Sequence, residues 1–365
     1  MTDKKKKVFV AMSGGVDSSV TAALMKEQGY DVAGVTMRFD IAHPDNKKTI
    51  SGGGSGSDDA RKVARALGIP HQVLDFSENL ADDVINDFTE EYGAGRTPNP
   101  CVRCNQFVKF GALYDKVMSL GADYLATGHY ARILFNKAQH GYELRKAKDS
   151  QKDQSYFLYR LDREALSKVL FPLGEFTKPQ VRDLARKFRL SVAEKSESQD
   201  ICFVADAGYK EFIRSRLGDD AFKPGPFRDH KGEIVGEHKG IINYTIGQRE
   251  KLGIALGHPV YVYKIDKAAN TVYVGLEEHL YARGLLAEKF YPIGMNIPSE
   301  TVEVSARIRY NASEVKGSLT YLGDDNICLV FEKPQKSVTP GQSVVFYRDD
   351  LLLGGAVIQE PILDE

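Results

Sequence analysis

The sequence predicts an α/β protein, with a doubly wound parallel sheet in its N-terminal half and a β-rich C-terminal part. Three observations support this prediction. Up to about residue 130, short apolar runs alternate with segments of helical period, as in βαβ units. From about residue 225, short alternating runs replace the helices. The chain of 365 residues is also long enough for two or three domains of roughly 100–200 residues.

The first elements are a strand, a glycine turn and a helix. Residues 8–12 form an apolar run of the buried-strand type, glycines at 14 and 15 interrupt it, and residues 20–26 resume at helical spacing before Gly29. The alternation continues with expected strands at 31–37, 71–76 and 123–127 and expected helices at 58–67 and 110–121. This order is typical of an open parallel sheet with helical crossovers.

Two further segments differ from this pattern. Residues 51–57 are all glycine or serine, which predicts a mobile surface loop because such a chain is costly to order. The C-terminal part shows short alternating runs between turn residues, which favour one or two small β-barrels or sandwiches. The expected strands there lie at 260–265, 271–274, 302–308, 317–322, 327–331 and 343–347.

Composition excludes several classes of protein. Hydrophobic residues make up 42% and charged residues 27%, which are ordinary globular values and argue against disorder and a disulfide scaffold. We see no apolar stretch of membrane-spanning length and no signal-peptide core, so we expect a cytoplasmic protein with no membrane partner. The 49 Lys+Arg and 50 Asp+Glu give a net charge of −1, which neither requires nor excludes a nucleic-acid partner.

Residues 13–19, Ser-Gly-Gly-Val-Asp-Ser-Ser, lie between the first strand and the first helix. Backbone N–H groups and a helix N-terminus in this setting can bind phosphate, and the serines add hydroxyl donors. Asp17 would repel an anion unless it handles Mg²⁺. Since the chain has no GxxxxGK[ST] sequence, the loop suits pyrophosphate release better than γ-phosphoryl transfer. A glycine turn without a ligand is the alternative.

Four cysteines are too few for a stapled fold, and we expect thiols. Cys101 and Cys104 form a CxxC pair, which is compatible with zinc, redox or core roles. Zinc would need a second close Cys/His pair, which the sequence lacks. Cys328 lies in an apolar run and is expected to be buried. Cys101, Cys104 and Cys202 are then available as reactive thiols; the alternative is that all three are inert. Cations that could stabilise thiolates are Arg103, Lys109 and Lys195.

Six motifs and a β-rich tail follow one another along the chain: SGGVDS, TPNPCVRCN, ATGHYAR, KDQSYFLY, SQDICF and NYTIGQR. In this order they resemble the tRNA-specific 2-thiouridylases, a family of PP-loop ATPases, over essentially the whole chain. The resemblance implies an adenine nucleotide α-hydrolase-like (PP-loop) catalytic domain at 1–215, a small central domain at 216–290 and a C-terminal β-barrel at 291–365.

The resemblance also implies a reaction. ATP adenylates the C2 oxygen of the wobble uridine (position 34) in the tRNAs for Lys, Glu and Gln, and persulfide sulfur displaces AMP to leave 2-thiouridine. In the family's pattern Cys202 carries the persulfide, and Cys104 is its catalytic partner that closes a disulfide. The implied cofactors are ATP and Mg²⁺. The implied partners are tRNA, an external reductant and a persulfide donor such as a cysteine desulfurase or a sulfur-relay protein.

By the same resemblance two groups of residues bind substrates. The nucleotide is expected to contact Ala11, Met12, Ser13, Gly14, Gly15, Val16, Asp17, Ser18, Met37 and Gly128. The tRNA is expected to contact Asn99, Pro100, Cys101, Lys152, Asp153, Gln154, Arg309 and Tyr310. Lysine and arginine can bind phosphates, and tyrosine can stack on a base.

Cys101 departs from the family, because many relatives carry Asp there. With Cys104 and Cys202 it could ligate a [4Fe–4S] cluster that delivers sulfide, although we favour the persulfide relay. Two other functions stay open: a PP-loop synthetase acting on a small molecule, and a non-catalytic RNA-binding protein with a decayed loop. His129 could be a general base or a packing residue of its loop.

Overall fold

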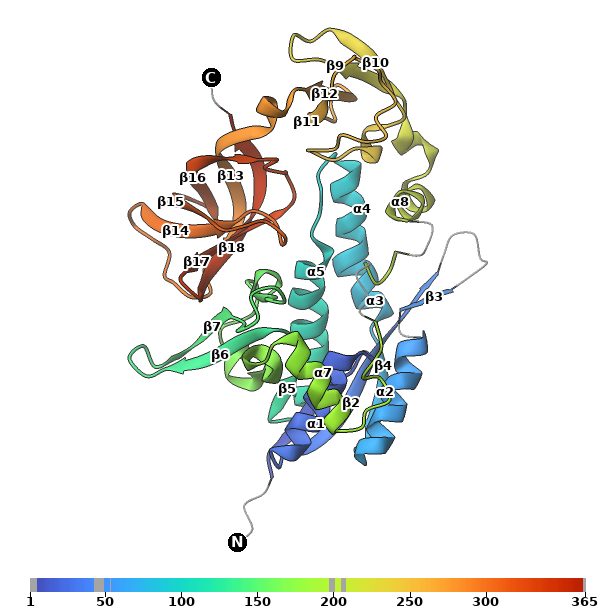
Figure 1. Cartoon of the computed structure of the whole chain (residues 1–365), viewed down its shortest axis with the longest axis vertical. Helices are drawn as coiled ribbons and strands as arrows, with labels where there is room; N and C mark the ends of the chain where they lie inside the picture. The colour runs from blue at the N-terminus through green and yellow to red at the C-terminus, as the bar shows by residue number, and fades with distance from the viewer. Residues whose placement is uncertain (1–4, 43–48, 53, 197–200, 205–207, 364–365) are drawn as a thin grey trace. The chain divides into compact units, whose positions relative to one another are not determined.

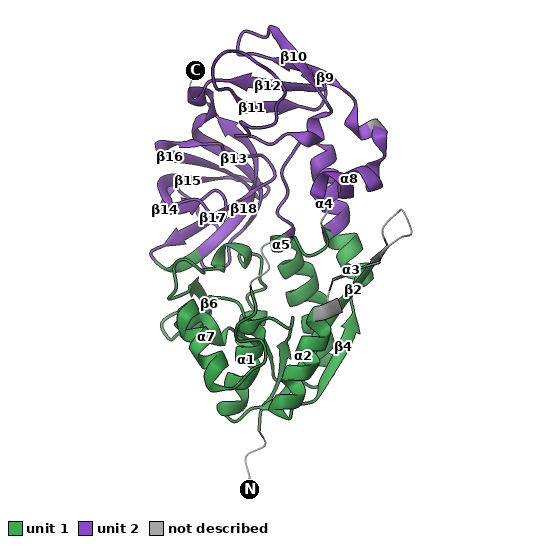
Figure 2. Cartoon of the chain, turned by 45° about the vertical axis from the view of Figure 1, so that its right-hand side comes forward, with its two compact units in different colours: residues 1–84, 101–203, 350–352 green, residues 85–100, 204–349, 353–365 purple. Residues whose placement is uncertain are grey.

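The computed structural model describes residues 5–42, 49–52, 54–196, 201–204 and 208–363, and it divides into two compact units (Figure 2). Unit 1 comprises residues 1–84, 101–203 and 350–352, and unit 2 comprises residues 85–100, 204–349 and 353–365. The chain therefore passes between the units several times. The bounds of the three consecutive domains expected from the sequence stay a prediction.

A parallel sheet forms the centre of unit 1 (Figure 1). β1 (Lys7–Ala11) pairs in parallel with β2 (Asp31–Ala42) on one side and with β5 (Tyr124–Ala126) on the other. β4 (His71–Asp75) adds to β2, and β8 (Val169–Leu170) adds to β5, both in parallel. The predicted doubly wound sheet is confirmed. Since the strand order reverses at β1, the carboxyl end of β1 is where such sheets bind ligands.

Three helices share an apolar core with this sheet. They are α1 (Val16–Glu27), α2 (Gly54–Leu67) and α7 (Lys178–Lys187). Apolar side chains of all three, among them Val20 of α1 and Val63 of α2, are buried in one cluster with residues of β1. α1 follows β1 directly, so this packing fixes the start of α1 at the carboxyl edge of the sheet.

A second helical segment carries two of the cysteines. It comprises α5 (Pro100–Arg103), the π-helix η2 (Cys104–Leu113) and α6 (Tyr114–Ser119). The helix expected at 110–121 is therefore present but begins ten residues earlier than the periodicity indicated. The wider i→i+5 hydrogen-bond pattern of a π-helix changes which positions share a face, and this explains why a 3.6-residue pattern missed its first half.

The prediction of a mobile loop at 51–57 is wrong for most of that segment. β3 (Thr49–Gly52) pairs antiparallel with the end of β2, and α2 already begins at Gly54. Residue 53 lies outside the described residues. A flexible composition gives a high ordering cost, but contacts with the rest of the fold can offset it.

The remaining elements of unit 1 are short. A hairpin follows β5 directly, and short helical turns connect the other segments. Their bounds are β6 (Ala131–Asn136), β7 (Gly141–Lys146), α3 (Ser77–Leu80), η1 (Ala81–Ile85), η3 (Ser155–Phe157), η4 (Ala165–Lys168) and η5 (Pro172–Glu175), with η1 ending in unit 2.

The described part of unit 2 contains two α-helices and a four-stranded sheet with the order β10-β9-β12-β11. The helices are α4 (Asn86–Gly93) and α8 (Tyr209–Leu217), and the strands are β9 (Gly225–Arg228), β10 (Ile234–His238), β11 (Tyr261–Asp266) and β12 (Thr271–Gly275). Short turns lie at η6 (Asp219–Phe222), η7 (Ile241–Asn243) and η8 (Glu277–Leu280).

The C-terminal strands close into a six-stranded barrel, which confirms the predicted β-barrel. The ring runs β13-β16-β15-β14-β17-β18, and β13 pairs with both β16 and β18. Closure removes the exposed strand edges that an open sheet would present. The bounds are β13 (Tyr281–Tyr291), β14 (Val302–Arg307), β15 (Val315–Gly323), β16 (Asn326–Lys336), β17 (Ser343–Arg348) and β18 (Leu351–Ile362).

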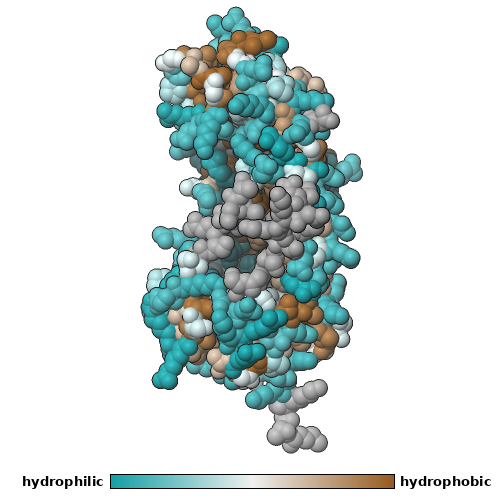
Figure 3. Space-filling model, turned by 90° about the vertical axis from the view of Figure 1, so that its right-hand side faces the viewer, coloured by the Kyte–Doolittle hydropathy of each residue, from teal (hydrophilic) through white to brown (hydrophobic). Residues whose placement is uncertain are grey.

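Within the described ranges, no helix is both long and apolar enough to cross a membrane. On the face drawn in Figure 3, hydrophilic residues cover most of the described surface, and hydrophobic residues gather in small separate patches. Scattered patches of this size are normal on a protein surface.

Candidate active site

The loop predicted to bind phosphate joins β1 to α1 at the carboxyl edge of the sheet. Gly14 adopts φ +73°, which favours glycine, and a Cβ built there would lie 2.1 Å from the carbonyl oxygen of Gly56. Gly15 is the N-cap of α1 and provides no side-chain capping bond to the first N–H groups of the helix. This end of α1 can therefore offer backbone donors to an anion.

Serine hydroxyls hold the loop in shape. The Ser13 N–H donates to Ser18 Oγ at 3.1 Å, and the two hydroxyl oxygens lie 3.3 Å apart. Ser19 Oγ donates to the Gly15 carbonyl at 2.7 Å. Both serines predicted to bind the nucleotide, Ser13 and Ser18, are thus brought together, and their bonds preorganise the backbone around the start of α1.

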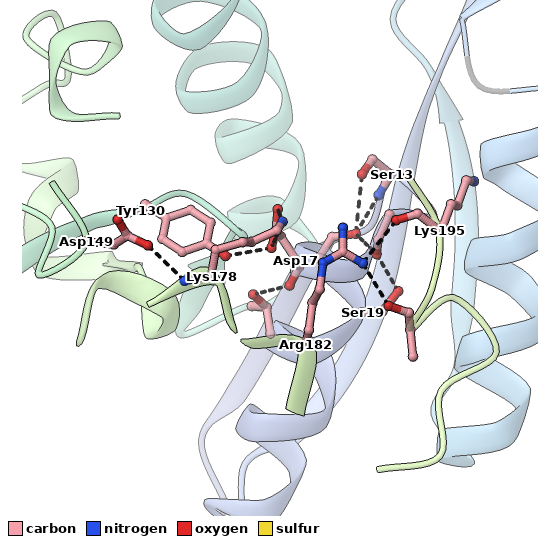
Figure 4. A network of polar contacts seen from close by, with 12 residues as sticks. Ser13, Asp17, Ser19, Tyr130, Asp149, Lys178, Arg182 and Lys195 are labelled. Carbon is pink, nitrogen blue, oxygen red and sulfur yellow. Dashed lines mark hydrogen bonds and ion pairs between the residues drawn. The ribbon is translucent and has the colours of Figure 1, made fainter. Parts of the chain in front are cut away.

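Asp17 is paired with a lysine that lies outside the loop (Figure 4). Lys178 Nζ lies 2.8 Å from each Asp17 carboxylate oxygen, and the Tyr130 hydroxyl donates to Asp17 Oδ1 at 2.8 Å. The Lys178 side chain is only 10% exposed, against 31% for Asp17. Sequence reasoning missed Lys178, which lies 161 residues from Asp17. The loop without a lysine of its own therefore faces one from α7.

A second lysine also contacts the loop (Figure 4). Lys195 Nζ donates to the Gly14 carbonyl at 3.1 Å and to the Asp59 carboxylate at 2.8 Å, and this bond lowers the pKa of Asp59. Arg182 donates to the carbonyl oxygens of Ala193 and Lys195, at 2.9 and 3.3 Å. These contacts fix the segment that leads toward Cys202. They also place Lys195, a candidate cation for the thiols, at the nucleotide loop.

The start of α2 lies directly against the loop. A Cβ built on Gly56 would approach the carbonyl oxygen of Ser13 to 2.6 Å, so only glycine permits this distance. This contact gives the physical reason why part of the glycine/serine segment is ordered: it packs on the backbone of the nucleotide loop.

Gly128 and Met37, expected on the nucleotide, lie at the same edge of the sheet. A Cβ on Gly128 would lie 2.9 Å from the backbone carbon of Asp17 and the nitrogen of Ser18, so residue 128 packs on the first turn of α1. Met37 is half-buried in β2, one residue after Thr36, whose hydroxyl donates to the Met12 carbonyl at 2.7 Å. The structure thus brings the residues predicted to bind nucleotide together.

The surroundings of His129 favour the role of a packing residue over that of a general base. It is buried between the rings of Phe110 and Phe171, and its Nδ1 lies 2.7 Å from Thr127 Oγ1. Burial lowers its pKa well below the usual 6.5, and Lys109 adds to this effect. The imidazole is therefore neutral at pH 7 and held by its neighbours.

Three of the four cysteines lie close enough to affect one another's ionisation. The pKa of Cys202 is raised to about 12, chiefly by desolvation and in part by Cys104 and Cys101, while Lys109 opposes these effects. Desolvation also raises the pKa of Cys101 and of Cys104, and Lys109 lowers both. All three are free thiols of unit 1 in this structure. Together they form the thiol cluster, which is protonated at neutral pH.

Lys109 is the cation that acts on this cluster. It lies five residues after Cys104 in the π-helix, whose turn closes from i to i+5, so the two positions lie on one side of η2. Arg103, another predicted candidate, donates to the Asp83 carbonyl at 2.8 Å and stacks on Phe107. Cys328 lies in β16 of unit 2 and is half-buried, so its expected burial is only partly observed.

The thiol cluster also has to be considered as a metal site. Among the described residues, no group of three or more His, Cys, Asp or Glu side chains is arranged to hold a metal ion. Residues 197–200 and 205–207, on both sides of Cys202, lie outside the described ranges. The described residues therefore give no support for the iron–sulfur cluster considered from the sequence.

The residues predicted to contact tRNA have varied surroundings. Asp153 is buried and accepts hydrogen bonds from the backbone of Ala147 and from Ser155, so it shapes its own turn. Gln154 accepts from the Tyr130 N–H at 3.0 Å. Lys152 is half-buried in unit 1.

The other tRNA candidates divide between the units. Asn99 and Pro100 belong to unit 2 and Cys101 to unit 1. Arg309 is exposed and Tyr310 half-buried in unit 2. The assignment of all these residues to tRNA stays a prediction.

Three family models match the chain in succession. They are described as a tRNA methyl transferase HUP domain at residues 6–206, a tRNA methyl transferase PRC-barrel domain at 210–276 and an aminomethyltransferase β-barrel domain at 282–358. The first covers more than half of the chain.

Curated relatives match along nearly the whole chain. The tRNA-specific 2-thiouridylase MnmA of Acetivibrio thermocellus is 49% identical over 97% of this chain and 99% of its own length. The tRNA-specific 2-thiouridylase MnmA 1 of Caldanaerobacter subterraneus is 48% identical over 98% of both chains. The MnmA of Carboxydothermus hydrogenoformans is 49% identical, again over 98% of each chain.

Proposed function

The chain belongs to the tRNA-specific 2-thiouridylase family, and on that premise we propose that it catalyses the ATP-dependent 2-thiolation of the wobble uridine, position 34, in the tRNAs for Lys, Glu and Gln. It is a PP-loop sulfurtransferase that modifies tRNA. One observation carries the proposal: a single unit holds both a phosphate loop at the carboxyl edge of its parallel sheet and a cluster of three thiols.

The first half of the reaction is adenylation. The uridine C2 oxygen attacks the α-phosphorus of ATP, and pyrophosphate leaves. The N-terminus of α1 and the loop of Ser13 to Gly15 bind the phosphates and stabilise the charge of the departing pyrophosphate. Gly128 permits the backbone to lie against this turn of α1. The C2 oxygen alone is a very poor leaving group. Once it is bonded to the α-phosphorus, it can leave as part of AMP.

Asp17 is the residue that would hold Mg²⁺. Its carboxylate oxygens are hard donors of the kind that Mg²⁺ prefers, and they lie on the first turn of α1, beside the loop. When bound, Mg²⁺ supplies neutralisation of phosphate charge. The chain itself supplies the orientation, because Tyr130 donates to Oδ1 of the same carboxylate.

The second half is sulfur transfer. The terminal sulfur of a Cys202 persulfide attacks C2, AMP leaves, and the base is joined to Cys202 through two sulfurs. The Cys104 thiolate then attacks the Cys202 sulfur, which releases 2-thiouridine and forms a Cys104–Cys202 disulfide. Each turnover thus consumes two electrons from an external thiol reductant, and an external persulfide donor, such as a cysteine desulfurase or a sulfur-relay protein, must reload Cys202.

We favour this relay over a mechanism with a [4Fe–4S] cluster. The described residues do not bring three ligands into a metal-binding arrangement, whereas a relay requires only that two thiols meet during the reaction. Cys101 then has no covalent part, and its place beside the target base is carried over from the family.

The experiment that tests the function combines ATP, Mg²⁺, a persulfide donor and a reductant with a tRNA for Lys, Glu or Gln. A matched tRNA with cytidine at position 34 is the control. We expect pyrophosphate release and 2-thiouridine, read by nucleoside mass spectrometry, with the first tRNA only. Pyrophosphate release that does not depend on tRNA would favour a synthetase for a small molecule. RNA binding without pyrophosphate release would favour a non-catalytic protein.

A further inference from the structure

Lys178 is a buried cation held by three parts of unit 1. Its backbone N–H, at the first position of α7, donates to the Asp149 carboxylate at 2.8 Å. The α7 N-terminus is fixed by a capping box between Thr177 and Gln180. The ammonium lies 5.7 Å from the centre of the Tyr130 ring. A lysine is rarely this buried without a defined partner, and the fold directs this one to the nucleotide loop.

The ion pair between Lys178 and Asp17 bears on how the loop can bind phosphate. Residues 13–18 contain no cation, so the loop cannot by itself balance the charge of a triphosphate. Instead the loop carries one carboxylate, and Lys178 neutralises it at 2.8 Å on both oxygens. Lysine is a compact charge on a long stem with three donors, which can change partners without any movement of the helix.

We propose that Lys178 is the phosphate-binding cation of this site: when Mg·ATP binds, Asp17 exchanges the ammonium for Mg²⁺, and Lys178 Nζ moves to an oxygen of the departing pyrophosphate. The ammonium thus takes the part that a lysine within the loop has in Walker A sites. Before ATP binds, the same ammonium pairs with the Asp17 carboxylate and so neutralises its charge at the start of α1. The inference rests on the proposed use of ATP.

Two other cations of the described residues lie near the loop, and both have other partners than Asp17. Lys195 donates to the Gly14 carbonyl and to Asp59, and Arg182 donates to two backbone carbonyls. Both hold the segment 193–195 in place. Lys178 is the cation on the acid of the loop itself, so it is the one whose release depends on what Asp17 binds.

The test compares ATP affinity in four proteins by calorimetry: wild type, Lys178→Met, Asp17→Asn, and the double variant. Without Mg²⁺, Asp17→Asn should bind ATP more tightly than wild type, because Lys178 is released for phosphate. The double variant should lose this gain and bind about 10-fold to 100-fold more weakly than Asp17→Asn, as expected for a charge-assisted contact. Equal affinities of Asp17→Asn and the double variant would overturn the proposal.

Two controls distinguish a pyrophosphate contact from a general effect of removing a lysine from α7. Lys187→Met removes an exposed lysine of the same helix, which pairs with Glu27 at 3.1 Å, and it should leave ATP affinity unchanged. AMP lacks the pyrophosphate group, so Lys178→Met should weaken ATP binding with Mg²⁺ while AMP affinity stays within about threefold. An equal loss for AMP and ATP would contradict a pyrophosphate contact.

The double variant carries neither charge, so it answers the question even if the single lysine variant fails to fold. None of these measurements uses tRNA or sulfur. Failure of thiolation would therefore refute the proposed function through the product assay, whereas failure of the lysine exchange would appear in ATP binding alone.

Discussion

Gly128→Ala should damage the nucleotide site through sterics alone. The added Cβ would lie 2.9 Å from the Asp17 carbonyl carbon and the Ser18 nitrogen, both backbone atoms, so the first turn of α1 must shift. Overpacking of this kind costs about 1–3 kcal/mol of folding free energy. A displaced α1 N-terminus also misaligns the phosphate donors, and displacements near 1 Å cost on the order of 10²-fold in rate. We expect a lower melting temperature and pyrophosphate release reduced by at least about tenfold.

Gly141→Ala is the matched control for this prediction. Gly141 also lacks a positive φ, and its added Cβ would meet only the Gln139 carbonyl oxygen, at 3.8 Å, an ordinary contact. Stability and pyrophosphate release should stay near wild type. If Gly128→Ala also keeps the wild-type melting temperature and rate, the packing of residue 128 on α1 does not position the phosphate site, and the reasoning fails.

Asp17→Ala should abolish pyrophosphate release and leave tRNA binding near wild type. Loss of one strong catalytic contact costs about 10²–10³ in rate, so a loss under about threefold would count against a catalytic role of Asp17. Cys101→Ser should retain most 2-thiouridine formation under anaerobic assay, whereas its inactivity would contradict a two-cysteine relay. The pKa of Cys202 is raised to about 12, and only the thiolate reacts. The rate of Cys202 alkylation by iodoacetamide should therefore rise about tenfold per pH unit from about pH 7 to 11. A rate that reaches a plateau below about pH 9 would contradict this. Arg309→Ala and Lys152→Ala should each lower the log–log salt slope of tRNA binding by about one unit, and unchanged slopes would leave both outside the interface.

Local pattern sufficed for the first strand, the loop and the first helix. The apolar run, the two glycines and the following helical period all arise from residues close in sequence, and β1 and α1 appear there as predicted. The barrel strands were also predicted in part, but β13 (Tyr281–Tyr291) and β18 (Leu351–Ile362) were not. These two strands pair with each other across about 70 positions of the chain, which alternation within one strand does not encode.

The site needed tertiary structure for the same reason. Thr177 and Gln180 signal a helix start, so sequence could have placed Lys178 at an N-terminus. Its bond to Asp17 spans 161 residues and has no local signature. Gly56 was assigned to a mobile loop because composition reports the entropy of a segment and not the backbone on which it packs.

Sulfur transfer by Cys202 and Cys104 is the central claim, and a single-turnover measurement tests it most directly. Enzyme loaded with persulfide is mixed anaerobically with ATP, Mg²⁺ and tRNA in the absence of any reductant, and 2-thiouridine is counted per enzyme molecule. The relay predicts at most one 2-thiouridine per enzyme, together with a Cys104–Cys202 disulfide found by peptide mapping. Repeated turnover without reductant, or one turnover that leaves both thiols free, would contradict the account.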